Sequence, residues 1–408
     1  MKTIKFRIEP NSEQRKVIDQ MIDANRIVYN NMITACKIHY TKTKELPSVF
    51  YMNKMATRIR NNSPYIEKAH SMTLNETARR VINACEKTLG VHKKESGELE
   101  IMTFRFILPN HHFPRYRSYG QFNSITYPSP KNYSVITEKK GNKDKRMLKL
   151  GKVPGLIRCY NQSTKIDGNM KTCTVKRKDM GRYRVYYACI TYDPFPISFT
   201  EAPRGPIGVD LGIHNIAALS DGTIFPNDHI FPKLKGTLKK HQRKLSRLSP
   251  GTKTFEKIKT RINHIYEKIT NHRKNNTEQI SSYIVKNYSH IVMEELSIRI
   301  LRSISRDRSM TNGYNDASLG TLRKRIIDKA LSAGREIILV DPKRTSQMCS
   351  VCEEIVEKNL STRNHICPYC GYIADRDVNA ARNILKRSYL FQTHWVDQPP
   401  LSLSQGTK

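Results

Sequence analysis

The chain has few acidic residues for its size, and it has no long apolar segment. Its 408 residues contain 36 Asp and Glu against 71 Lys and Arg, a net charge of +35. Solubility does not need so large an excess, which predicts a polyanionic partner, with nucleic acid as the leading candidate. No run approaches the roughly 18 apolar residues of a membrane span. Neither a basic amphipathic helix nor a lipidation signal is apparent, so we expect no membrane partner.

The N-terminus also lacks the apolar core of a signal peptide. Residues 1–8, Met-Lys-Thr-Ile-Lys-Phe-Arg-Ile, alternate in the way a strand does. Five of the nine cysteines have no pair spacing: Cys36, Cys85, Cys159, Cys173 and Cys189. Such scatter does not indicate a disulfide framework. We expect a reducing cytoplasmic location, with the protein associated with the nucleoid.

The other four cysteines form two C-x-x-C pairs near the C-terminus: Cys349 with Cys352, and Cys367 with Cys370. The 14 residues between the pairs suffice for a short hairpin that returns the second pair to the first. This spacing predicts a closed, tetrahedral Zn²⁺ site, and four unrelated buried thiols are the less favoured alternative. A closed site has no open position for a substrate, so the zinc should be structural.

The length favours two or more units, and Pro194, Pro196 and Pro203 mark a boundary between them. In the first part we expect a strand over residues 2–8, helices over 12–40 and from 64 to about 90, and a hairpin over 172–190. In the second part we expect two strands within 207–224, basic helices over 233–274, helices over 277–287, 318–334 and 377–386, and strands over 289–296 and 335–342. Residues 387–408 are expected to be a disordered tail.

Residues 233–274 are strongly basic, with 14 Lys and Arg but only two acids, Glu256 and Glu267. A solvated helix face is the alternative, but such a face normally carries balanced charge, because like charges at helical spacing repel each other. The imbalance therefore indicates contact with nucleic acid. The residues expected to make that contact are Lys239, Lys240, Arg243, Lys244 and Arg247.

Three acids stand where strand or helix ends should place them: Asp210, Glu294 and Asp377. Each of these acids could also have a purely structural role. Asp210 could cap the turn at Gly212, Glu294 could be a surface acid, and either Asp377 or Asp375 could cap a helix. Were the three to converge, they could hold two Mg²⁺ (or Mn²⁺) ions roughly 3.5–4 Å apart, an arrangement suited to phosphodiester cleavage. Spacing alone does not show that they converge.

The motifs around these acids resemble the three RuvC motifs of the TnpB family, insertion-sequence proteins ancestral to type V CRISPR nucleases. They are Gly208-Val-Asp210-Leu-Gly212, Ile291-Val-Met-Glu294-Glu-Leu296 and Cys370-Gly-Tyr-Ile-Ala-Asp-Arg-Asp377-Val-Asn. Thr345-Ser-Gln-Met-Cys-Ser-Val-Cys is similar to the entry to the family's zinc ribbon. Phe6-Arg-Ile-Glu-Pro-Asn-Ser-Glu-Gln, Asn25-Arg-Ile-Val-Tyr-Asn30 and Phe113-Pro-Arg-Tyr-Arg resemble its N-terminal segments. The resemblance covers residues 1–386.

The resemblance implies a multidomain α/β protein with an RNase H-like RuvC domain. That domain would occupy residues 201–345 and 372–386, with a zinc ribbon inserted at 346–371. A wedge β-barrel would comprise residues 1–10 and 106–200, and a helical recognition lobe residues 11–105. By position, Asp210, Glu294 and Asp377 would bind Mg²⁺, and the four paired cysteines Zn²⁺. Arg323 matches a family arginine expected near the scissile phosphate, with a phosphate-facing helix residue as the alternative.

The activity implied is that of an RNA-guided, Mg²⁺-dependent DNA endonuclease that cuts double-stranded DNA beside a short motif. The guide RNA would come from the transposon end, with one protein bound per RNA. A nuclease-inactive repressor is the main alternative, but it predicts loss of a metal acid, and none is lost. An accessory transposase protein is a further alternative, although no tyrosine has the His-hydrophobe-His setting of a recombinase nucleophile.

Two single positions and one segment depart from the family pattern. Leu319 stands where the family commonly has Trp, and Glu353 follows Cys352 where Gly is usual. Residues 271–278, Asn-His-Arg-Lys-Asn-Asn-Thr-Glu, replace an Asn-Gln-Arg-Lys-Asp…His segment. These changes put in question the local packing and the way the protein holds the nucleic-acid strands. They leave the three acids untouched.

Overall fold

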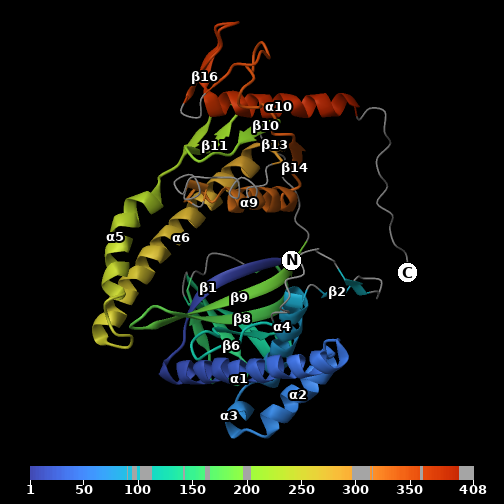
Figure 1. The fold of residues 1–408 in the computed structure, drawn as a ribbon, viewed down its shortest axis with the longest axis vertical. Coiled ribbons are helices and arrows are strands. Elements are labelled where there is room, and N and C mark those ends of the chain that lie inside the picture. The colour runs from blue at the N-terminus through green and yellow to red at the C-terminus, as the bar shows by residue number, and fades with distance from the viewer. Residues whose placement is uncertain are drawn as a thin grey trace. The chain divides into compact units, whose positions relative to one another are not determined.

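The chain forms two compact units, Met1–Pro196 and Ile197–Lys408, in the computed structural model (Figure 1). The structure describes residues 1–89, 91–93, 99–101, 113–140, 143–160, 166–195, 204–295, 313–314, 316–358 and 362–394. The expected tail beyond residue 394 and Leu296 of the second acidic motif lie outside these residues. None of the helices in the described ranges is long and apolar enough to cross a membrane.

The first unit is built on a seven-stranded antiparallel sheet with the order β4-β8-β9-β1-β7-β6-β5. The strands are β1 (Lys2–Glu9), β4 (Ser124–Tyr127), β5 (Tyr133–Lys140), β6 (Lys143–Leu150), β7 (Ile157–Cys159), β8 (Gly168–Asp179) and β9 (Arg184–Pro194). A short hairpin, β2 (Val91–Lys93) with β3 (Leu99–Ile101), lies apart from it, and a 3-10 turn (Pro130–Asn132) precedes β5. The predicted first strand and the 172–190 hairpin are confirmed.

Helices α1 (Ser12–Thr43), α2 (Val49–Asn61), α3 (Pro64–Glu67) and α4 (Ser71–Leu89) complete this unit. A capping box starts α1, because the Asn11 side chain accepts from the Gln14 backbone and the Gln14 side chain accepts from the Asn11 backbone. The apolar face of α1 packs with the inner face of the sheet in one core, which includes Met21 and Tyr127. The helical stretch predicted from residue 64 to about 90 is present, but it is divided into two helices because the chain turns between α3 and α4.

The second unit contains a five-stranded mixed sheet with the order β12-β11-β10-β13-β14. Its strands are β10 (Ile207–Asp210), β11 (Asn215–Leu219), β12 (Ile224–Pro226), β13 (His290–Glu294) and β14 (Glu336–Val340). β10 pairs in parallel with β13 and β13 in parallel with β14, whereas β11 is antiparallel to both its neighbours. The carboxyl ends of β10, β13 and β14 therefore meet at one edge.

Helices cover both faces of this sheet. α6 (Lys253–Asn287) and α9 (Leu319–Ser332) share a core with one face, where Ile284 and Leu322 pack with Ile291. On the other face α10 (Arg376–His394) packs Ile384 against Val292. Burial on both faces explains why the central strands are almost wholly apolar.

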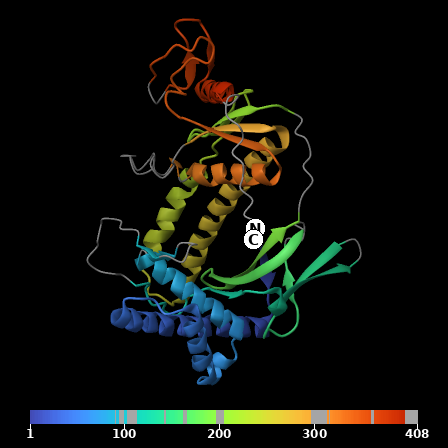
Figure 2. The same cartoon turned by 90° about the vertical axis from the view of Figure 1, so that its right-hand side faces the viewer.

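Two predicted helix boundaries are wrong. α6 is one continuous helix, where the sequence suggested separate helices before residue 274 and after residue 277. Its buried stripe, which includes Ile262, Ile269 and Ile280, runs through that region without Gly or Pro. Likewise, α10 continues to His394, past residue 386 where the pattern ended it, so residues 387–394 of the expected disordered tail are helical. α5 (Ile230–Leu245) lies beside α6 in both views (Figures 1 and 2), and Leu238 and Ile258 pack between them.

Candidate metal centres and basic surface

Two of the predicted acids end neighbouring parallel strands. The register pairs Val209 of β10 with Met293 of β13, so Asp210 and Glu294 follow side by side at the same edge. Helix α10 packs very closely against β10. A Cβ added to Gly208 would lie only 2.0 Å from the Ala381 carbonyl oxygen of α10. Glycine at position 208 therefore lets α10 lie directly on β10.

The third acid, Asp377, stands in the first turn of α10. Asp375 Oδ1 accepts hydrogen bonds from the backbone amides of Asp377 (2.9 Å) and Val378 (3.2 Å), so Asp375 caps the helix. The Asp377 carboxylate accepts instead from Asn215 Nδ2 of β11, at 2.9 Å. Capping is therefore the role of Asp375, and Asp377 is free to face the sheet edge.

Glu294 and Asp377 lie close enough to Asp210 to act on its carboxyl electrostatically. Burial raises the pKa of the Asp210 carboxyl well above its usual value, and the carboxylates of Glu294 and Asp377 raise it further. Burial also raises the pKa of Glu294, against the opposing effect of a hydrogen bond from Thr345. Negative charge concentrated in a half-buried place of this kind disfavours ionisation, and a bound cation would relieve it.

The separation of the acids differs from that of the cysteines. Within the described ranges, groups of three or more His, Cys, Asp or Glu with all ligand atoms inside 4.8 Å occur only among the four paired cysteines. The acids are thus neighbours at one edge rather than a tight cluster. Oxygen ligands of this type are those that Mg²⁺ and Mn²⁺ prefer, and the donor set fits such an ion.

Sequence reasoning missed two side chains that hold these acids. Asn215 donates to Asp377, and Thr345 Oγ1 donates to Glu294 Oε1. Asn215 stands five residues after Asp210, on the returning strand, and Thr345 opens the motif that leads into the first cysteine pair. For Thr345 the available signal was its position in a recognised motif, whereas Asn215 lies beyond the first motif; which acid each one contacts depends on the tertiary fold.

The four paired cysteines come together, as their spacing predicted. Cys349 Sγ lies 3.7 Å from Cys370 Sγ, and Cys352 Sγ lies 3.5 Å from Cys367 Sγ. Four thiolates about 2.3 Å from a central Zn²⁺ would be roughly 3.8 Å apart, so the arrangement suits a tetrahedral ion. Burial acts to raise the pKa of the Cys367 thiol, but backbone amides of Cys370 and Tyr369 help to lower it to about 7.

The two cysteine pairs form matching turns. The amide of Gly371 donates to the Cys367 carbonyl at 3.0 Å, and the amide of Glu353 donates to the Cys349 carbonyl at 3.0 Å. Gly371 has φ 72° and Glu353 has φ 66°, both in the left-handed region. Glycine suits such a position, since a side chain there costs roughly 1–2 kcal/mol. Glu353 also pairs with Lys386 of α10 at 3.0 Å, an exposed contact that offsets little of that cost.

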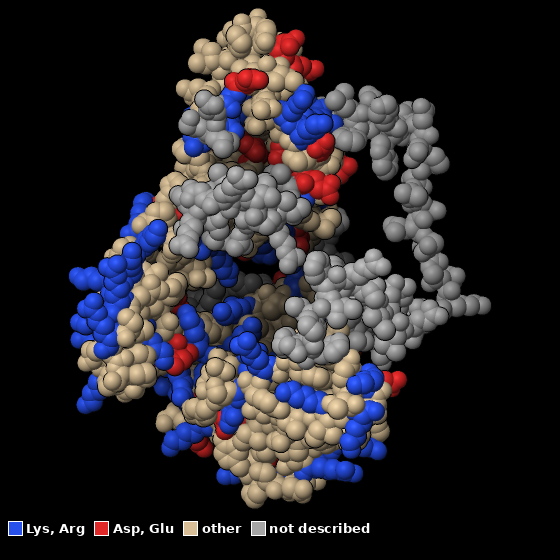
Figure 3. All heavy atoms as spheres, in the orientation of Figure 1, with Lys and Arg blue, Asp and Glu red and all other residues tan. Residues whose placement is uncertain are grey.

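The predicted basic residues lie together along one side of α5 and the turn that follows it, where Arg247 stands. An open hollow is lined by Gly236, Lys239, Lys240, Arg243, Lys244, Arg247 and Leu248. We call these five Lys and Arg residues the α5 basic face. Figure 3 shows Lys and Arg gathered over this helix, and in the part of the chain that the structure describes no acid pairs with the five. This face therefore differs from an ordinary solvent-exposed helix face, on which acidic and basic side chains are balanced.

Arg323 lies half-buried on α9, and its Nε has no hydrogen-bond partner in the described residues. No hydrogen bond or ion pair links it to the three acids within those ranges. Leu319, which replaces the family's usual Trp, is buried in the core between α6, α9 and the sheet. The structure therefore keeps a large apolar residue at this position and leaves the role of Arg323 as an expectation.

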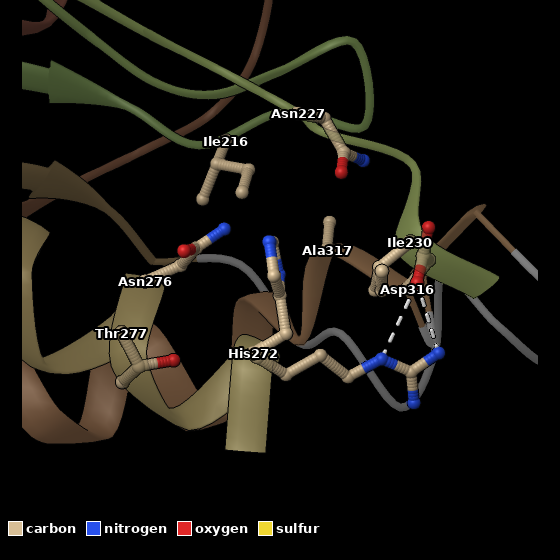
Figure 4. Close-up of a pocket in the computed structure, with 9 residues that line it drawn as sticks. Ile216, Asn227, Ile230, His272, Asn276, Thr277, Asp316 and Ala317 are labelled. Atoms are coloured by element: carbon tan, nitrogen blue, oxygen red, sulfur yellow. Dashed lines mark hydrogen bonds and ion pairs between the residues drawn. The ribbon is translucent and has the colours of Figure 1, made fainter. Parts of the chain in front are cut away.

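Residues 271–278, the third departure, lie within α6 and partly line a small cavity (Figure 4). There Arg273 Nη2 lies 3.0 Å from Asp316 Oδ1, which also accepts from the Phe231 amide at 3.1 Å. Further along, Glu278 pairs with Arg325 and Lys329 of α9, each at 2.9 Å. The divergent segment thus ties α5, α6 and α9 together.

Three family models match this chain in separate segments. A helix-turn-helix domain model of the IS605-type OrfB proteins matches residues 1–45, and their main model, described as "Probable transposase", matches residues 192–305. The model described as "Cas12f1-like, TNB domain" matches residues 320–384, which include the cysteine pairs and Asp377.

Individual relatives extend these matches. A protein of Escherichia coli (strain K12) named "Putative RNA-guided DNA endonuclease InsQ" is 24% identical over 94% of this chain and 92% of its own length. A Streptomyces pristinaespiralis protein named "Putative RNA-guided DNA endonuclease" is 30% identical over 52% of each chain. Among solved structures, a Cas12f1–sgRNA–target DNA complex covers 95% of this chain and 99% of its own, at 17% identity and a TM-score of only 0.32.

The α/β unit that carries the three acids and the four-cysteine ribbon is therefore similar to insertion-sequence OrfB proteins of the IS605 type. Over nearly its whole length the chain also resembles proteins named RNA-guided DNA endonuclease and TnpB-like.

Proposed function

We propose that this protein is an RNA-guided, divalent-metal-dependent DNA endonuclease encoded by an insertion sequence. The observation that carries the proposal is the position of Asp210, Glu294 and Asp377 at one sheet edge, with the pKa of Asp210 raised by burial and further by the other two acids. The names of the E. coli and Streptomyces relatives support RNA-guided DNA cleavage as the activity. Nuclease-inactive binding is disfavoured because all three acids are present.

In this proposal the acids hold Mg²⁺ or Mn²⁺, and the four cysteines hold a structural Zn²⁺. The ions at the acids would supply an activated water and stabilisation of the leaving oxygen. The chain's own contribution is to hold the acids near one another: Asn215 donates a hydrogen bond to Asp377, Thr345 donates one to Glu294, and the parallel strands set Asp210 beside Glu294.

The mixed sheet with helices on both faces supports an RNase H-like RuvC domain over residues 201–345 and 372–386, with the ribbon at 346–371. The antiparallel sheet of the first unit is proposed as the wedge barrel, and its helices as the recognition lobe. We propose that one chain binds one guide RNA from the transposon end and cuts double-stranded DNA beside a short motif. Arg323 is proposed to contact the backbone near the cut.

The α5 basic face is proposed to bind the nucleic-acid backbone. Changing Lys239, Lys240, Arg243 and Lys244 together to Gln should flatten the salt dependence of nucleic-acid binding. Each phosphate contact contributes about 0.9 to the slope of log K against log salt, so the slope should fall by up to roughly 3–4. Binding titrations at several salt concentrations measure it. Exchanging Lys for Arg and Arg for Lys at the same positions should preserve the slope, and an unchanged slope in the Gln variant would contradict the assignment.

The proposed activity is tested by sequencing the RNA that co-purifies with the protein and then rebuilding the reaction. We expect one defined RNA from the transposon end. Purified protein with that RNA and Mg²⁺ should cut DNA that matches the guide and spare DNA that does not, because base pairing carries the sequence recognition. Absence of bound RNA, or cutting that ignores the match, would overturn the proposal.

A further inference from the structure

Thr345 joins the sheet edge to the segment that enters the cysteine ribbon. Its side chain is buried, with the residue 3% exposed, and Oγ1 donates a hydrogen bond to Glu294 Oε1. The Pro342 carbonyl oxygen is also within reach, at 3.2 Å. A carboxylate is the stronger acceptor, so the hydroxyl proton is directed to Glu294. In the part of the chain that the structure describes, Thr345 is the side chain that donates to this acid.

The position of Thr345 is itself fixed by α10. Asn383 Nδ2 donates to the Thr345 carbonyl at 2.8 Å and to the Met348 carbonyl at 2.7 Å. Asn379 Nδ2 donates to the same Met348 carbonyl at 2.8 Å, and Asn379 Oδ1 accepts from the Ser350 amide at 2.9 Å. Both asparagines are fully buried, where such bonds are strongest and their loss is costly.

A third residue continues this pattern. Arg387 donates to the backbone carbonyls of Asp341 and Lys343. Asn379, Asn383 and Arg387 are spaced by four residues and so form one stripe along the helix. Their partners run the opposite way, from Ser350 back to Asp341, so α10 holds the whole 341–350 segment against its side.

The same helix carries Asp377 in its first turn. One rigid element therefore fixes the third acid directly and, through the 341–350 segment, the hydroxyl that contacts the second acid. We propose that Thr345 is a positioning residue that holds the Glu294 carboxylate in its metal-binding orientation. This inference rests on the proposed function, and it concerns how the site is held rather than what it cuts.

The test compares two substitutions that differ in one hydroxyl. Thr345→Val keeps the shape and removes the donor, whereas Thr345→Ser keeps the donor. We expect Mn²⁺ to bind about tenfold more weakly to the Val variant, as found when partners of metal-binding carboxylates are removed. The Ser variant should bind Mn²⁺ nearly as the parent does. Calorimetric Mn²⁺ titration of the full-length protein with its guide RNA measures this without reference to cleavage.

The acid site is identified in that titration as the Mn²⁺ binding that Asp210→Ala removes. Cleavage by Thr345→Val should need about tenfold more Mn²⁺, and its guide binding should be unchanged. Equal Mn²⁺ affinity in the Val variant and the parent would overturn the role of Thr345 and leave the proposed function standing. If Asp210→Ala removes no Mn²⁺ binding from the parent, the metal site itself is wrong, which is a separate failure. Equal weakening in both Thr345 variants would also overturn the role, since the hydroxyl would then not be the cause.

Discussion

Asp210→Ala is expected to abolish DNA cleavage while guide RNA and target DNA still bind. Both Glu294 and Asp377 act electrostatically on the Asp210 carboxyl. The Ala substitution removes one of the three carboxylates and leaves the α5 basic face unchanged. Loss of several kcal/mol of metal-dependent stabilisation corresponds to a fall of three or more powers of ten in rate. Cleavage assays beside RNA- and DNA-binding assays on the same variant measure both effects, and EDTA should reproduce the defect in the parent.

Related variants make this prediction stricter. Glu294→Ala and Asp377→Ala should behave like Asp210→Ala, and combining them should add little, because residues that act as a unit are not additive. Asp375→Asn is the matched control, since Asp375 caps α10 and an asparagine can still accept both hydrogen bonds. Normal cutting by all three Ala variants would refute the assignment of the site.

Cys367→Ser is expected to remove the metal from the four-cysteine ribbon and unfold the ribbon. Binding of a structural zinc is typically worth on the order of 10 kcal/mol, so losing one of four thiolates is not compensated locally. The effect should reach the acid site, because the segment between Thr345 and Ser350 leads directly into the cluster. Zinc content per chain and thermal unfolding of the full-length protein are the measurements.

The control for this second prediction is a cysteine outside the cluster. Cys189→Ser, in the sheet of the first unit, should keep the full zinc content. Metal analysis that finds no zinc in the parent protein would show that the ribbon is held in another way.

The elements that position the acids could be predicted because their patterns are local. An apolar run followed by an acid marks the end of β10 and of β13. The doubled C-x-x-C fixed which four cysteines would meet. In each case the information lies within a few residues of the feature that it specifies.

What the sequence did not reveal depends on contacts between distant segments. Nothing near Asn215 shows that it will donate to Asp377, since the two are brought together by the packing of α10 on the sheet. The choice between Asp375 and Asp377 as helix cap was open until the backbone geometry was known. α2 was missed, although its buried residues Met52 and Ala56 are four apart, the spacing of one helix face.

The order of the site residues along the chain has a consequence for synthesis. The first unit ends at Pro196, before any of the three acids has been made, and it can fold as the ribosome continues. Asp210 and Glu294 follow, then both cysteine pairs, and Asp377 comes last. A nascent chain therefore possesses its α5 basic face well before it possesses a complete set of carboxylates. Under the proposed function, a growing polypeptide would therefore engage nucleic acid before it is able to cut it.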